Sequence, residues 1–103
     1  MTGWLRRRWR LVVVRGNSMA PTLHDGDRLI VRVGRAPATG DLVVFRARDV
    51  VPGADLPWMV KRVQRVEPDG AVTVRGDNPH SQDSRHFGAV PRAAILGVAT
   101  GRR

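Results

Sequence analysis

The sequence predicts an all-β domain, and three observations support this fold class. Short apolar stretches rich in valine recur along the chain, separated by Gly, Pro and Asp. Two of the stretches alternate between apolar and polar positions, as half-buried strands do. A chain of 103 residues is long enough for one domain and too short for two. We therefore expect a small coiled or barrel-like sheet with little helix.

Each expected strand lies between turn-forming residues. The strands are predicted at 11–15, 28–33, 42–47, 58–66, 71–75 and 95–99. The second places Leu29, Val31 and Val33 on one face. The fourth places Met59, Lys61 and Val63 together. Segment 49–57 contains two prolines and a glycine and is expected to be a loop, whereas 76–88 is polar and irregular.

Charge divides the chain into a basic arm at residues 1–10 and a domain at 11–103. The sequence holds 18 Lys and Arg against 9 Asp and Glu, a formal charge of +9. Trp4, Leu5 and Trp9 interleave with the arginines of the arm, which suits peripheral membrane contact through residues 4–10. The apolar run at 11–14 is too short for the core of a signal peptide or for a membrane span. A cytoplasmic protein is therefore expected.

Several function classes are disfavoured by composition. The absence of cysteine removes disulfides, thiolate metal sites and a cysteine nucleophile. His80 and His86 lie six residues apart in a predicted loop, so neither a metal site nor a cofactor is expected. The few aromatic residues form no stacking array, which argues against nucleic-acid binding. A non-enzymatic basic β-barrel that binds nucleic acid remains the alternative to an enzyme.

Ser18 and Lys61 are the candidate catalytic residues. Ser18 follows a predicted strand and precedes Pro21, which exposes its hydroxyl on a tight turn. A serine in this position is also a common capping residue. Lys61 is the only lysine beside seventeen arginines, and burial on an apolar strand face would lower its pKa. The residues alone leave open a stray surface lysine, or a triad built on a histidine.

These residues belong to a larger pattern. Segment 16–23, Gly-Asn-Ser-Met-Ala-Pro-Thr-Leu, resembles the nucleophile box of the type I signal peptidases and their relatives. Segments similar to the other boxes of that family follow in the same order, at 25–27, 40–45, 60–63 and 76–91. The resemblance spans residues 14–98, nearly the whole chain.

The resemblance implies a role for each matching residue. Ser18 would attack the scissile carbonyl, and Lys61 would act as the general base. Ser81 would orient the lysine amine, while Asp83 and Arg85 would form a structural ion pair. The Ser18 N–H would be an oxyanion donor, and Gly16 occupies the position of a second one. The implied substrate pockets are lined by apolar residues equally expected of a plain core: Val14, Met19, Leu23, Met59 and Val60.

The same resemblance implies the partner. Substrate would bind as an extended strand between 11–15 and the strand carrying Lys61. The usual anchor and the insertion before the last box are absent, and this short form most resembles the maturation protease of nickel-type superoxide dismutase. The expected function is thus removal of an N-terminal leader from a precursor, with general leader processing at a membrane surface as an alternative. Self-cleaving repressor proteases fit poorly, because 17 residues before Ser18 leave no room for their DNA-binding domain.

The last box departs from the family pattern in one detail. Only Pro79 and His80 separate Asn78 from Ser81, one residue fewer than in the family pattern. Asp77 and Asn78 are interpreted simply as turn residues.

Overall fold

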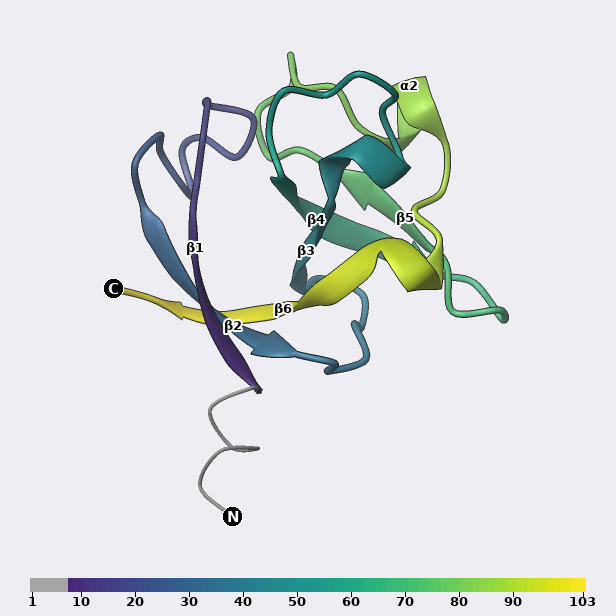
Figure 1. The fold of residues 1–103 in the computed structure, drawn as a ribbon. Helices are drawn as coiled ribbons and strands as arrows, with labels where there is room; N and C mark the ends of the chain where they lie inside the picture. Colours follow the sequence, from purple (N-terminus) through teal and green to yellow (C-terminus); the bar gives the residue numbers. More distant parts are fainter. Residues whose placement is uncertain (1–7) are drawn as a thin grey trace.

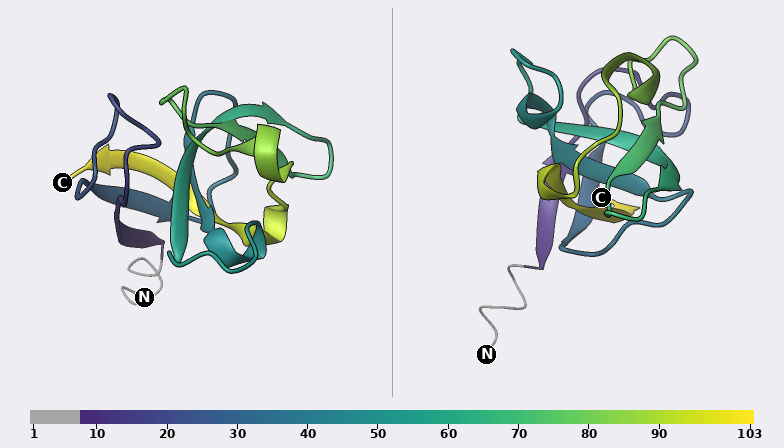
Figure 2. Two further views of the ribbon diagram at one scale, coloured as in Figure 1. Left: turned by 90° about the horizontal axis from the view of Figure 1, so that it is seen from above. Right: turned by 90° about the vertical axis from the view of Figure 1, so that its right-hand side faces the viewer.

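Six strands form a single antiparallel sheet. The computed structural model describes residues 8–103, and its strand order is β1-β2-β6-β3-β4-β5 (Figure 1). The strands are β1 Trp9–Val13, β2 Arg28–Val33, β3 Leu42–Arg46, β4 Trp58–Val66, β5 Val72–Arg75 and β6 Ile95–Arg102. The sheet coils instead of lying flat (Figure 2). The predicted all-β class is therefore confirmed.

Helical structure is limited to three short turns in the described part of the chain. These are η1 Ala47–Asp49, η2 Arg92–Ala94 and α2 Ser84–Phe87. Helix α2 was not predicted, and it lies within segment 76–88, which was interpreted as irregular. A helix of four residues is too short to show an apolar period, and its side-chain cap, Asp83, initiates it. No helix among residues 8–103 has the length and apolar character required to cross a bilayer.

The predicted strand bounds agree with the structure in the middle of the chain and differ at its ends. β2 and β4 have the predicted limits, whereas β1 begins at Trp9 and ends at Val13. β6 continues to Arg102, because its second half pairs with β2 from Val33↔Gly97 to Leu29↔Arg102. Both differences arise from pairing with a distant strand, which the local pattern does not contain.

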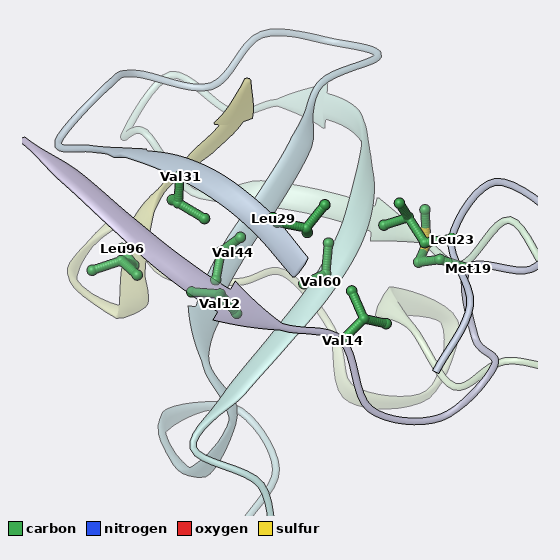
Figure 3. Packing of buried hydrophobic residues seen from close by; sticks show 9 residues of the cluster. All are labelled: Val12, Val14, Met19, Leu23, Leu29, Val31, Val44, Val60 and Leu96. Atoms are coloured by element: carbon green, nitrogen blue, oxygen red, sulfur yellow. The ribbon is translucent and has the colours of Figure 1, made fainter. Parts of the chain in front are cut away.

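Two apolar clusters fill the interior, and β3 contributes to both. Val44 points into the first cluster, whereas Val43 and Phe45 point into the second. Figure 3 shows nine residues of the first cluster, including Val44 from β3 and Val60 from β4. The second cluster lies among β3, β4, β5 and the segment around Val90. Each half of the sheet therefore covers its own core, and β3 joins the two.

Candidate active site

A groove of about 230 Å³ runs between the end of β1 and the start of β4. Its lining consists of Val13, Val14, Arg15, Ser18, Leu56, Trp58, Met59, Val60, Lys61 and Gln82. The two candidate catalytic residues, 43 positions apart in sequence, thus line one cavity. The lining also includes Arg15, Leu56, Trp58 and Gln82, which the sequence analysis did not assign to the site. These residues line the groove because the end of β1 and the start of β4 face each other, an arrangement that the local sequence pattern does not reveal.

Local hydrogen bonds set the turn that presents Ser18. The Val14 N–H donates to the Asp27 carbonyl, and the Gly26 N–H donates to the Val14 carbonyl, each at 2.8 Å. Gly16 then turns the chain with a φ of +80°, a conformation that favours glycine. Its own N–H donates to the Asp25 carboxylate at 2.7 Å. The Gly16 N–H therefore points at Asp25, and its predicted part in an oxyanion site stays untested.

Ser18 is half-buried at the base of this turn. Its N–H donates to no group among residues 8–103, while its carbonyl accepts from the Asn78 N–H at 3.0 Å. A backbone N–H without a partner beside a serine hydroxyl is the arrangement that an oxyanion site requires. The predicted role of the Ser18 N–H as an oxyanion donor is consistent with this geometry.

Lys61 is buried in the middle of β4, opposite Val43 on β3. Its side chain is only 2% exposed, and it forms no ion pair with any acid in the described part of the chain. Burial lowers the pKa of the Lys61 amine, and the negative charge of Asp83 opposes that shift only in part. An amine that loses its proton more readily than an ordinary lysine can serve as a general base.

Gly76 allows Ser81 to lie against the Ser18 turn. A Cβ on Gly76 would overlap the Ser81 side chain and would lie 2.7 Å from the Ser18 carbonyl oxygen. Only a residue without a side chain fits between these two groups. Ser81 is 7% exposed, and its hydroxyl donates to Asp83 at 3.5 Å. The structure therefore brings Ser81 to the back of the turn that carries Ser18.

Asp83 and Arg85 form the ion pair that the resemblance implied. The Arg85 guanidinium donates to both carboxylate oxygens, at 2.9 and 3.0 Å, and Asp83 is fully buried. The Gly76 N–H and the Arg85 N–H each donate to the same carboxylate at 3.1 Å. Burial alone would raise the pKa of Asp83, but these hydrogen bonds and the Arg85 charge outweigh it and hold that pKa far below its usual range. Asp83 therefore stays ionised throughout the neutral range.

Asn78 fastens the turn at residues 16–23, which carries the candidate nucleophile Ser18 and is here called the nucleophile turn, to the loop after β5. Its N–H donates to the Ser18 carbonyl and its side-chain amide donates to the Asn17 carbonyl, both at 3.0 Å. The side-chain oxygen accepts from the His80 N–H at 3.0 Å, which shapes the short connection to Ser81. Asn78 was predicted only as a turn residue, because no local signal reveals its contacts with Asn17 and Ser18, about 60 positions away.

Asp77 makes a second connection, between the nucleophile turn and β4. Its carboxylate accepts from the Thr22 hydroxyl at 2.5 Å and from the Arg62 guanidinium at 2.7 and 3.0 Å. Hydrogen bonds from Arg62 and Thr22 lower the pKa of Asp77 despite its partial burial. Because Arg62 follows Lys61, this contact relates the position of the lysine strand to that of the serine turn. Asp77, like Asn78, does more than form a turn.

The five predicted pocket residues fall into two groups. Val14, Met59 and Val60 line the groove. Met19 and Leu23 are buried in the first core cluster, where Figure 3 shows them packed beside each other, and neither is among the groove-lining residues. Residues from β4 and from the end of β1 therefore form much of the groove wall, whereas Met19 and Leu23 pack in the core beneath the turn that carries Ser18.

The histidines lie outside the groove. His24, His80 and His86 are absent from its lining, and the His86 ring nitrogen Nδ1 accepts from the Asp83 N–H at 3.3 Å. Among residues 8–103, no group of His, Cys, Asp or Glu is arranged to hold a metal ion. The groove therefore brings Ser18 together with a lysine and with no histidine.

Comparison with known proteins places this geometry in context. Residues 3–100 match the Peptidase S24-like family. The chain is 33% identical over 127 aligned positions to a protein of Synechocystis sp. named probable signal peptidase I-1, covering 81% of this chain and 65% of that protein. It is 36% identical over 85 positions to the mitochondrial ATP-independent inner membrane protease subunit 1a of Arabidopsis thaliana, covering 72% and 46%. The chain thus spans less than two thirds of either relative.

Proposed function

Because this chain belongs to the Peptidase S24-like family of signal-peptidase-like serine proteases, we propose that it is a serine endopeptidase with a Ser18–Lys61 dyad. One observation carries the proposal: a buried lysine, which has no acidic ion-pair partner within residues 8–103, lines the same groove as the candidate serine. Arginine would not serve in its place, since a guanidinium stays charged at any pH that a protein tolerates.

In this mechanism one proton passes from the Ser18 hydroxyl through the Lys61 amine to the leaving amine. The Lys61 amine accepts the proton of the Ser18 hydroxyl as its oxygen attacks the scissile carbonyl. The Ser18 N–H stabilises the oxyanion, and the lysine then donates its proton to the leaving amine. The amine next activates a water molecule, which hydrolyses the acyl ester and frees Ser18. Ser81 and the buried Asp83 keep the back of the site polar and ordered.

Substrate is proposed to bind as an added strand along the groove. Both backbone groups of Val14 bond toward the 26–27 segment, so those of Val13 and Arg15 face the opposite way under strand alternation. On the other wall, β5 begins its pairing with β4 only at Arg62, which leaves Trp58–Lys61 without a β5 partner. Two unpaired edges on facing walls suit an extended peptide that bonds to both.

We propose a leader-bearing precursor as the substrate, with the precursor of nickel-type superoxide dismutase as the specific candidate. Support comes from the short architecture: β4 and β5 are joined directly by the 67–71 turn. By contrast, the alignment with the Synechocystis protein extends over 127 positions, more than this chain contains, so that relative carries inserted residues.

The test is a processing assay with a nickel-type superoxide dismutase precursor, followed by mass spectrometry. The unmodified protein is expected to release the leader, whereas S18A and K61R leave the precursor intact because nucleophile and base are lost respectively. K61R places a charge that cannot be lost at a buried position, so circular dichroism of both variants is measured to establish the native fold before their rates are compared. Processing by K61R at the unmodified rate would overturn the dyad. Cleavage of other leader-bearing proteins but not of this precursor would overturn only the specific substrate.

A further inference from the structure

We propose that Arg15 is a specificity-determining residue that favours substrates with an acidic side chain near the scissile bond. This inference rests on the proposed function, because it concerns the peptide that occupies the same groove. It adds a charge preference that neither the dyad nor the apolar walls would impose.

The charges on the groove lining are all of one sign. Arg15 and Lys61 are its two cationic residues, and its other eight residues include no acid. Lys61 must be neutral to act as the base, and burial already lowers its pKa. In the working enzyme, Arg15 therefore carries the lasting charge of the groove. A peptide with a basic side chain at that point would meet repulsion, and one with a carboxylate would meet attraction.

The Arg15 guanidinium is exposed and has no acidic partner among residues 8–103. Asp25, which lies beside this turn, instead accepts the Gly16 N–H. Six other arginines form ion pairs with acids, namely Arg46, Arg62, Arg65, Arg75, Arg85 and Arg102. Arg15 is thus available for a carboxylate supplied by a ligand.

The position of Arg15 relative to Ser18 limits where that carboxylate lies. Arg15 follows the free edge of β1 and precedes Ser18 by three residues. An extended peptide advances about 3.3 Å per residue, so a side chain facing Arg15 lies within about three positions of the scissile bond. A guanidinium binds a carboxylate through two parallel hydrogen bonds, which makes the preference one for Asp or Glu over neutral polar residues.

The experiment begins with a pooled library of synthetic peptides and mass spectrometry to find an uncharged sequence that is cut. Dependence on Ser18 is established with S18A. Glu, Gln and Lys are then placed at each of the three positions on either side of the cut, and kcat/KM is measured. At one or two neighbouring positions, Glu is expected to exceed Gln by about three- to tenfold, and Lys to fall below Gln.

The variants distinguish Arg15 from the general positive charge of the protein. R15Q should abolish the preference for Glu, R15E should invert it toward Lys, and R15K should retain part of it. R35Q is the matched control, since Arg35 is also exposed, forms no ion pair within residues 8–103 and lines a separate cavity with Arg92. Under R35Q the preference is expected to persist. R35Q should also cut the neutral peptide at the unmodified rate.

The outcomes separate this inference from the proposed function. Ser18-dependent cleavage without a preference for Glu, or with a preference that R15Q retains, overturns the role of Arg15 and leaves the dyad standing. If no library peptide and no precursor is cut in a Ser18-dependent way, the proposed function fails and the role of Arg15 fails with it.

Discussion

At the scale of single residues, burial decides what Lys61 is able to do. The other seventeen basic residues are arginines, and many of those in the described chain lie at the surface. Lys61 instead lies between Met59 and Val63 on the same face of β4, with only 2% of its side chain exposed. The cost of burying an ammonium group is relieved when it loses its proton. The packing that buries the lysine therefore also favours the neutral amine that the proposed dyad requires.

This lowered pKa predicts a pH-dependent rate. Below its pKa, Lys61 is an ammonium ion and cannot accept the Ser18 proton, so kcat/KM should rise with pH and level off below the ordinary value of 10.5. Asp83 does not account for the rise, because its pKa lies far below the neutral range. The measurement is kcat/KM for an uncharged peptide from pH 5 to 10. A flat profile down to the acid end would contradict Lys61 as the base.

At the scale of elements, the loop after β5 fixes the position of the nucleophile turn relative to β4, the strand that carries Lys61. Asn78 bonds to the turn from one side, and Asp77 links that turn to Arg62 on β4. Gly76 provides the space in which Ser81 approaches the Ser18 carbonyl. Residues 76–78 therefore hold the nucleophile turn, which follows β1, in place relative to β4, although β1 and β4 are not neighbours in the sheet.

The edge strand β1 carries an exposed apolar row on its outer face. Trp9, Leu11 and Val13 are 46%, 49% and 39% exposed. The register places Arg32, Ile30 and Arg28 of β2 beside them, with the Arg32 guanidinium 5.7 Å from the centre of the Trp9 ring. Apolar and aromatic side chains bordered by arginine suit the surface of an anionic bilayer. We propose peripheral membrane contact through this face; the rest of the predicted contact segment, 4–7, lies outside the described residues.

Vesicle co-sedimentation tests this contact. Binding is expected to vesicles of phosphatidylglycerol and phosphatidylcholine, to weaken in high salt, and to be low with phosphatidylcholine alone. L11S should weaken binding about tenfold, because it removes a side chain that would be buried in the interface. V66S is the control, since Val66 has similar exposure at the far end of β4. Equal binding by L11S and the unmodified protein would contradict the proposed face.

At the scale of the whole molecule, β3 makes two cores depend on one another. Val44 and Phe45 are adjacent and fully buried, yet they belong to different clusters. β3 also pairs with both β6 and β4, so it connects the half that carries Ser18 to the half that carries Lys61. The site between the halves is therefore complete only when both are folded. The prediction of a single domain at residues 11–103 rests on chain length and stays a prediction.

We expect both halves of the sheet to unfold in a single cooperative transition. F45A should lower the free energy of unfolding by about 3–5 kcal/mol, and V44A should lower it by less, since it removes fewer buried atoms. In both variants, far-ultraviolet circular dichroism and peptide cleavage should be lost at one denaturant concentration. If loss of the second cluster in F45A left a separate transition for the β1–β2–β6 half, the two halves would be independent units.

Much of the fold is predictable because strand alternation is a local property. The alternation of Leu29, Val31 and Val33 defined β2, and the turn signals on either side defined the limits of β4. The extension of β1 and β6 was not predictable, because both depend on pairing with β2. Helix α2 was missed because four residues are too few to show an apolar period.

The sequence by itself determined the all-β class, the two candidate catalytic residues and the family resemblance, since each depends on residue types at fixed spacings. Tertiary structure alone decided that Ser18 and Lys61 line one groove, that Arg15 lies on its wall, and that Met19 and Leu23 belong to the core. It also decided the positioning contacts of Asp77 and Asn78. The physical reason is that these contacts join residues from different segments, such as Ser18 with Lys61 and Thr22 with Asp77, and only the order and coiling of the strands determine which of them meet.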